Sequence, residues 1–292
     1  MRLFRKPLFW LTVQLVMTFA FLSWTEGLEY ERHPDTQSYL NLSQAESLSE
    51  ALSHRRTLGY PLFLKAVTSS GSWLKPVPTV QILLFFGSVL LFWWAIQRCS
   101  GSGWLALAAA FPLPWAGVMT LAALVLPDFL ASAAAVVAVS CLFVLAMDAP
   151  RVIWWMGLGT AMFLAYQLRP AAVFLIVFLP LLGLILKWLR GERSWEALAR
   201  WTATATLVTM LPFLAFCSWR WMTVGHFGVV SFGGLNQAGM AASFLDGQVV
   251  SQLPREHRRL ARNMLRMRRE RGWQTMTAQS AMVEYFAQYS DN

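Results

Sequence analysis

The sequence predicts an all-α fold, a polytopic transmembrane helical bundle, and two observations predict it. Hydrophobic residues make up 57% of the 292 residues and charged residues only 13%, with 15 Trp and 20 Phe. This composition is typical of a membrane protein rather than of soluble domains. Long apolar runs also recur along the chain, and a run of about 20 residues crosses a hydrocarbon core of about 30 Å.

Seven runs meet this length requirement. We expect spans at residues 8–25, 77–97, 104–126, 128–147, 152–168, 171–189 and 201–219. The first run follows three basic residues, as in a signal peptide, but its bulky Phe, Trp and Leu favour a retained anchor. Pro127 and Pro170 stand between consecutive spans, where proline permits a tight turn.

Basic residues in the short connections predict the orientation. Arg98, Arg151 and the basic residues of 187–200 fall on the same side as the basic amino terminus. Cationic connections stay in the cytoplasm, so this side is expected to be cytoplasmic. The polar loop 26–76 then faces outward, together with Asp128, Arg169 and the residues after 220.

The expected organisation is a transmembrane domain, 1–219, with the outer loop 26–76, followed by an outer tail, 220–292. The tail is either a small terminal domain or the start of a soluble domain in a longer protein. The net charge of +9 favours an anionic partner, and for a membrane protein this is lipid phosphate rather than nucleic acid. Cys99, Cys141 and Cys217 show no paired spacing, so neither a disulfide framework nor a metal cluster is expected.

Amphipathic patterns occur in both polar regions. In the outer loop, Leu40, Gln44, Leu48 and Leu52 repeat at every fourth residue, which predicts an interfacial helix. The glycine-rich stretch 225–234 is expected to be a loop packed back on the membrane domain. A basic helix is expected from about Pro254, and its arginines form either a solvated face or a surface for anionic headgroups.

Two carboxylates lie on the outer side in this topology, and each has two candidate roles. Asp35 could act as a general base, or it could cap the helix that begins near Thr36. Asp128, after Pro127, could stabilise the first turn of its helix. It could also orient an acceptor or support a divalent cation such as Mg²⁺ or Mn²⁺. No residue is assigned as a metal ligand.

Cations and aromatic residues accompany these carboxylates. Arg55, Arg56 and Arg169 could contact lipid headgroups without further function, or could bind the phosphate of a lipid-linked leaving group. Tyr39 and Tyr60 could line an acceptor or sugar site, or could serve as interfacial anchors.

Four short motifs carry a family resemblance. They are Pro34-Asp35-Thr36-x-Ser38-Tyr39-Leu40, Arg56-x-x-Gly59-Tyr60-Pro61-Leu62-Phe63, Pro127-Asp128 and Leu168-Arg169-Pro170. In order and sidedness they resemble the outer loops of GT-C glycosyltransferases, particularly bacterial relatives of protein mannosyltransferases and aminoarabinose transferases. The resemblance covers about the first 190 residues. The two consecutive prolines of the family's longer Arg-Pro-Pro-x-Tyr-Pro motif are replaced here by Thr57 and Leu58.

The resemblance implies a GT-C type fold and an inverting glycosyltransferase of the bacterial inner membrane. Such enzymes move a sugar from a polyprenyl-phosphate carrier to an acceptor glycan, lipid or protein on the periplasmic side. Asp35 would be the catalytic carboxylate and Asp128 the acidic residue of the second outer turn. Arg56 and Arg169 would hold the leaving phosphate.

Two other classes of protein stay open. A transporter or flippase of lipid-linked precursors would need polar or ionisable side chains deep in its spans. The sequence offers few, and Gln14 and Gln81 are expected near span ends. A non-catalytic assembly or scaffold subunit is harder to dismiss than a transporter, because the chain is short for an enzyme of this kind.

Overall fold

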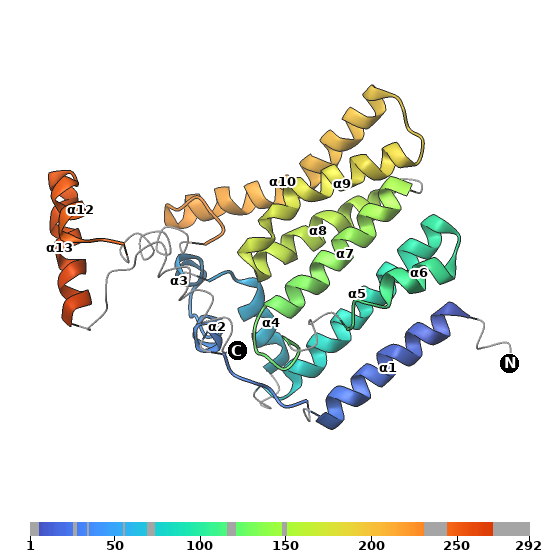
Figure 1. The fold of residues 1–292 in the computed structure, drawn as a ribbon, viewed down its shortest axis with the longest axis horizontal. Helices are drawn as coiled ribbons and strands as arrows, with labels where there is room; N and C mark the ends of the chain where they lie inside the picture. Colours follow the sequence, from blue (N-terminus) through green and yellow to red (C-terminus); the bar gives the residue numbers. More distant parts are fainter. Residues whose placement is uncertain are drawn as a thin grey trace. The chain divides into compact units, whose positions relative to one another are not determined.

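The computed structural model describes residues 6–25, 28–33, 35–54, 56–68, 74–115, 121–147, 151–230 and 244–270. Over these residues the protein is all-helical and contains no strand (Figure 1). The chain forms two compact units, Met1–Val230 and Ser231–Asn292. Long apolar helices make up the first unit, and the second contains α12 (Gly247–Gln252) and α13 (Arg255–Glu270).

Among the described residues, five helices are long and apolar enough to cross a membrane. They are α1 (Pro7–Thr25), α5 (Pro76–Ser100), α7 (Asp128–Met147), the segment Pro170–Leu189, and α10 (Trp195–Val224). The segment Pro170–Leu189 consists of the 3-10 helix η3 (Pro170–Phe174) and α9 (Leu175–Leu189). The apolar helix α8 (Val152–Leu168) is shorter, with 17 residues. Six of the seven expected spans therefore coincide with apolar helices, which supports a membrane protein.

The expected span 104–126 is wrong as a single helix. Helix α6 (Gly103–Ala110) stops after eight residues, and the next turn contains Pro112 and Pro114. Proline lacks the N–H that an inner helical turn needs, and its ring clashes with the turn before it. The described residues 111–115 and 121–127 continue without an α-helix.

Two buried glutamines bind the backbone of this unwound segment. Gln14, in the middle of α1, donates its Nε2 to the carbonyl of Phe111 at 2.7 Å. Gln81 of α5 donates to the carbonyls of Ala122 and Leu124 at 3.2 and 3.3 Å. An apolar surrounding offers no water to these carbonyls, so side-chain donors are needed. The expectation that Gln14 lies near a span end is therefore wrong.

One end of the bundle carries the outer-loop residues, and we call it the site end. Helices α1 and α8 end there, while α5 and α7 begin there. Glu31, after α1, forms a parallel β-bridge with Leu124, just before α7. At the opposite end, Gly103 meets Pro7. The connections at that end carry Arg98, Arg151 and Lys187, as the sequence-based orientation requires; the identity of the two sides stays a prediction.

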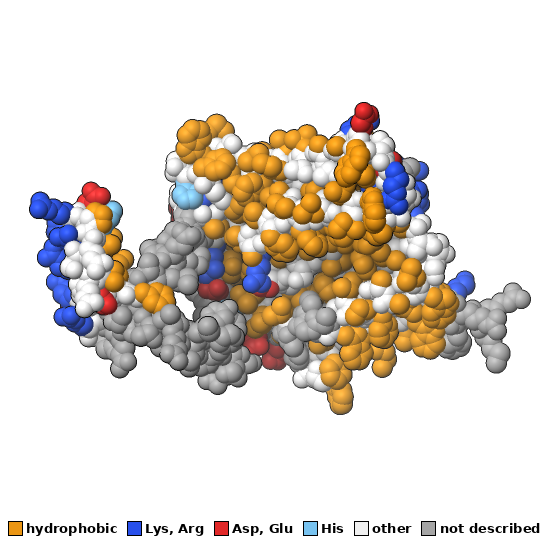
Figure 2. Space-filling model, turned by 45° about the horizontal axis from the view of Figure 1, so that its top comes forward, with side chains coloured by type: hydrophobic (Ala, Val, Ile, Leu, Met, Phe, Trp, Pro, Cys, Tyr) orange, Lys and Arg blue, Asp and Glu red, His pale blue; other side chains and the backbone are white. Residues whose placement is uncertain are grey.

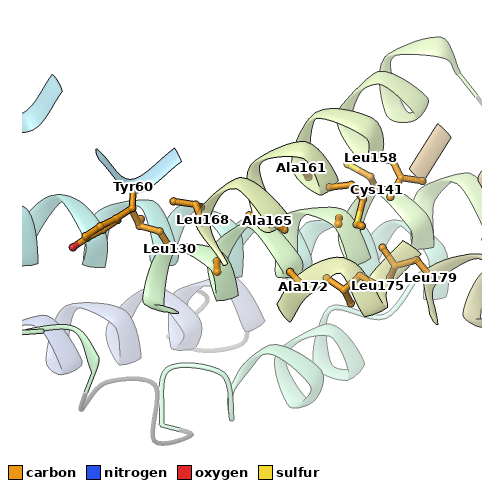
Figure 3. Packing of buried hydrophobic residues seen from close by; sticks show 14 of the residues in the cluster. Tyr60, Leu130, Cys141, Leu158, Ala161, Ala165, Leu168, Ala172, Leu175 and Leu179 are labelled. Atoms are coloured by element: carbon orange, nitrogen blue, oxygen red, sulfur yellow. The ribbon is translucent and has the colours of Figure 1, made fainter. Parts of the chain in front are cut away.

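The core of the first unit surrounds α7. This helix packs against α5, α8 and α9, and α10 packs on α8 and α9 (Figure 1). Figure 3 shows the buried cluster, which contains Leu130 and Cys141 of α7 together with Ala161 and Ala165 of α8. Large apolar side chains remain exposed on the outer faces of the helices and cover much of the surface seen in Figure 2. This surface is the kind that a bilayer would cover.

The outer loop contains three short helices, α2 (Thr36–Ser43), α3 (Leu48–Ser53) and α4 (Gly59–Thr68). The single amphipathic helix expected through Leu40 and Leu52 is therefore wrong. Ser47 starts a new helix, since its Oγ accepts a hydrogen bond from the Glu50 amide at 3.1 Å. The apolar stripe is split as well, with Leu52 buried and Leu48 exposed.

The last long helix, α10, extends beyond the expected 201–219. Ser194 caps its first turn by accepting from the Ala197 amide at 3.3 Å. It ends at Gly225, whose φ of 70° favours glycine. Val229 then returns to a buried cluster with Leu52, so residues 225–230 pack back as expected, while residues 231–234 of the predicted loop lie outside the described residues. The first compact unit therefore includes the residues up to Val230.

Candidate functional site

Two backbone hydrogen bonds fix the approach to Asp35. The Glu31 amide donates to the Ala123 carbonyl at 2.8 Å, and the Val125 amide donates to the Glu31 carbonyl at 3.0 Å. Thr36 adds a buried side-chain bond from its Oγ1 to the Val125 carbonyl at 3.1 Å. The start of α2 is thereby attached to the strand-like segment that leads into α7.

The carboxylate of Asp35 does not cap α2. Asp35 stands at the N-cap position, but its backbone is helical, with φ −75° and ψ −20°, and its side chain bonds to no helix amide. It forms an ion pair with the guanidinium of Arg56 instead. The Asp35 side chain is 44% exposed. The capping role proposed from the sequence is therefore wrong, and the carboxylate is accessible.

Arg56 is held from three sides. Besides the Asp35 carboxylate, it contacts Ser38, because its Nε donates to Ser38 Oγ at 3.1 Å. Its guanidinium carbon also lies 5.1 Å from the centre of the Tyr39 ring, a cation–π arrangement. Only 17% of the Arg56 side chain is exposed. The fixed guanidinium restricts the position of the Asp35 carboxylate.

A close backbone approach brings Arg56 to the end of α8. A Cβ placed on Gly59 would lie 2.7 Å from the Gln167 carbonyl oxygen, so only glycine fits there. Next to it, the buried Thr57 donates its Oγ1 to the Leu168 carbonyl at 3.4 Å. The segment 56–59 is thus fixed on the residues that immediately precede Arg169.

Arg169 forms an ion pair with Asp128. Asp128 is in the first turn of α7, and Arg169 follows the last residue of α8. The Arg169 side chain is 53% exposed and that of Asp128 is 20% exposed. This second pair joins α7 and α8 at the site end. The guanidinium of Arg169 is more accessible than that of Arg56.

Tyr39 lies near charged groups of both ion pairs. Burial raises the pKa of its hydroxyl, while the charges of Arg56 and Arg169 act to lower this pKa and that of Asp35 acts to raise it. The charges on both pairs therefore lie near one phenol group. The structure brings together four of the predicted charged residues, Asp35, Arg56, Asp128 and Arg169; the predicted Arg55 lies outside the described residues.

Tyr60 lies beneath Tyr39. The two rings meet edge to face with their centres 5.3 Å apart. The Tyr60 hydroxyl donates to Gln81 Oε1 at 3.1 Å, and burial raises the Tyr60 pKa well above its usual range. Both tyrosines are buried, so neither is an exposed interfacial anchor. Tyr60 supports the site from below.

Several supporting residues were not identified from the sequence. Thr36, Ser38, Gly59 and Gln81 position the charged groups through the contacts given above. Arg220 is another: its side chain is buried in α10, and its Nε donates to the Leu52 carbonyl at 2.8 Å. A single arginine near the end of an apolar helix was the available signal, but it equally fits a headgroup contact.

The site electrostatics are balanced. Each carboxylate faces a guanidinium, so each formal negative charge is paired with a positive one. Within the described ranges, no group of three or more His, Cys, Asp or Glu side chains could hold a metal ion. A groove of about 520 Å³ lies elsewhere, between α9 and α10, lined by residues such as Leu184, Leu198 and Met210. The divalent cation stays a prediction.

Comparisons with protein-family models, curated proteins and solved structures gave no significant match.

Proposed function

We propose that the protein is a GT-C type membrane glycosyltransferase that transfers a sugar from a polyprenyl-phosphate-linked donor to an acceptor on the outer side. One observation carries the proposal. Asp35, the carboxylate singled out by the sequence motif, is accessible, is not used as a helix cap and lies with Arg56 near the pair Asp128–Arg169. A general base and cationic groups close together are what this transfer requires.

In the proposed reaction, Asp35 accepts the proton of an acceptor hydroxyl or amine. The acceptor atom then forms a bond to the anomeric carbon of the sugar from the face opposite the leaving group. The bond between this carbon and the phosphate oxygen breaks, and polyprenyl phosphate departs with the electron pair. The anomeric configuration is inverted.

The two arginines differ in exposure, and we assign them different roles for this reason. Arg169 is more exposed than Arg56, so it is the guanidinium that a donor phosphate reaches first. Binding of phosphate would compete with Asp128 for Arg169, and guanidinium binds both anions through paired hydrogen bonds. The released Asp128 carboxylate would then be available to orient the acceptor. Arg56 mainly positions Asp35.

A non-catalytic assembly subunit is the second candidate, and the mutual pairing of all four charges favours it. In that case the two ion pairs only fasten the outer loop to the bundle. The transporter alternative needs ionisable groups deep in the membrane. In α5, α7 and α8, Asp, Glu, Lys and Arg occur only near the helix ends.

The test is sugar transfer by the purified full chain in lipid, supplied with radiolabelled polyprenyl-phosphate sugars and host acceptor extract. Asp35→Asn is expected to lower the rate by about 10²- to 10⁴-fold, the usual contribution of a general base. Glu31→Gln is the matched control, since this exposed carboxylate is in the same loop and only its backbone is bonded. Unchanged transfer by Asp35→Asn would disprove the assignment. A protein that transfers no sugar while Asp35→Asn lowers its stability would favour the assembly subunit.

A further inference from the structure

The second unit presents a basic face on α13. Successive residues of an α-helix are rotated by about 100°, so arginines at suitable spacings share one side. Six arginines of α13 fall within an arc of roughly 100°. They are Arg255, Arg258, Arg259, Arg262, Arg266 and Arg269. Figure 2 shows Lys and Arg side chains gathered along one side of this unit.

The rest of the α13 surface is partly covered within the unit, although Leu260 and Met267 remain exposed. Ala261 is buried, Met264 and Leu265 are half-buried, and α12 packs against the helix. This packing leaves the arginine face outward. Five of the six arginines are exposed, and Arg258 is half-buried.

The positive charge of this face is only slightly compensated. Arg266 Nε lies 3.8 Å from Glu270 Oε1. Both side chains are exposed, and an exposed ion pair contributes little to stability. Arg258 and Arg262 donate to the backbone carbonyls of Leu253 and Arg258 at 2.7 and 3.3 Å, which leaves their charge in place. The face therefore attracts an extended anionic surface rather than a single carboxylate.

The position of α13 in the chain indicates which anionic surface this is. Residues 225–254 connect it to the site end of α10, and about 30 residues reach at most about 100 Å. A bilayer crossed by the first unit would always lie within this distance of α13. The effective concentration of lipid headgroups around α13 would therefore be high. The described part of α13 contains no Phe, Tyr or Trp for base stacking, so nucleic acid fits less well.

We propose that the arginine face of α13 binds the anionic phospholipid headgroups of the bilayer at the site end. The attraction is electrostatic, because the six arginines of this face pair with lipid phosphates. It is therefore sensitive to salt. This membrane contact is independent of the sugar transfer proposed above.

The experiment uses the full chain in nanodiscs that contain a headgroup-labelled TEMPO lipid as quencher. Asn263, exposed beside the arginine face, is replaced by Cys and labelled with bimane in a Cys99→Ala background, since Cys141 and Cys217 are buried. With 30% phosphatidylglycerol the lipid is expected to quench the dye, and 0.5 M NaCl is expected to remove most of this quenching. Nanodiscs whose unlabelled lipid is phosphatidylcholine alone should give little quenching.

Three variants test the role of charge. Arg259→Gln with Arg262→Gln and Arg266→Gln should weaken docking by about fivefold per charge. The corresponding Lys triple variant should retain docking, which separates charge from geometry and from loss of folding. Glu256→Gln with Glu270→Gln, on the same helix, should strengthen it.

Equal quenching in the neutral and the anionic discs, or full quenching in the Gln triple variant, would overturn the proposal. Binding of a soluble polyanion such as heparin, without quenching in anionic discs, would also overturn it.

Discussion

Replacing Gly59 by Ala tests how the outer loop is positioned on the bundle. A Cβ at this position would lie 2.7 Å from the carbonyl oxygen and 2.8 Å from the carbonyl carbon of Gln167. Both atoms belong to the backbone of α8, so neither can rotate away. Overpacking of this kind costs about 1–3 kcal/mol. The change should therefore destabilise the protein although alanine is the better helix former.

Gly87→Ala is the matched control. Gly87 is inside α5, and a Cβ there would meet no atom within 4 Å. Removing this glycine should stabilise the helix by about 0.5–1 kcal/mol. The two glycine replacements should thus differ by about 1.5–4 kcal/mol in the free energy of unfolding.

Unfolding in mixed micelles of rising dodecyl sulfate fraction, followed by circular dichroism, measures this difference. Hydrogen exchange of residues 56–62 locates the effect. Gln167→Ala should not rescue Gly59→Ala, because the clash is with backbone atoms. Equal stability of the two glycine variants, or rescue by Gln167→Ala, would show that the loop does not pack on α8 in this way.

Two further predictions concern the charged contacts. Arg220→Met leaves the Leu52 carbonyl without its charged donor and should lower the free energy of unfolding by about 2–4 kcal/mol. Hydrogen exchange in α3 should become faster. Unchanged exchange would show that Arg220 does not hold α3 in place. Because Arg169 is largely exposed, a double-mutant cycle of Asp128→Asn and Arg169→Gln should give a coupling below about 1 kcal/mol. A much larger coupling energy would mean that the Asp128–Arg169 pair mainly stabilises the contact between α7 and α8.

The sequence predicted apolar helices well because their length is set by the bilayer. It also grouped Asp35, Arg56, Asp128 and Arg169 on one side, and the structure places these residues at one end of the bundle. Which arginine pairs with which aspartate was not predictable. That choice depends on the approach of Gly59 to Gln167, a contact between residues far apart in the chain.

Two errors had visible signals in the sequence. Pro112 and Pro114 mark the end of α6, but the apolar run around them suggested an uninterrupted span. Ser47 and Glu50 have the spacing of a capping box and mark the start of α3 inside the expected loop helix. In both cases local backbone chemistry overrides the apolar pattern.

Gln81 connects the non-helical segment that follows α6 to the candidate site. Its amide donates to the carbonyls of Ala122 and Leu124, and its oxygen accepts from Tyr60 beneath Tyr39. Because an apolar interior makes each unpaired polar group costly, these bonds hold one another in place. The non-helical segment that follows α6 thus supports Tyr60, and through Tyr39 it supports the position of Arg56 beside Asp35.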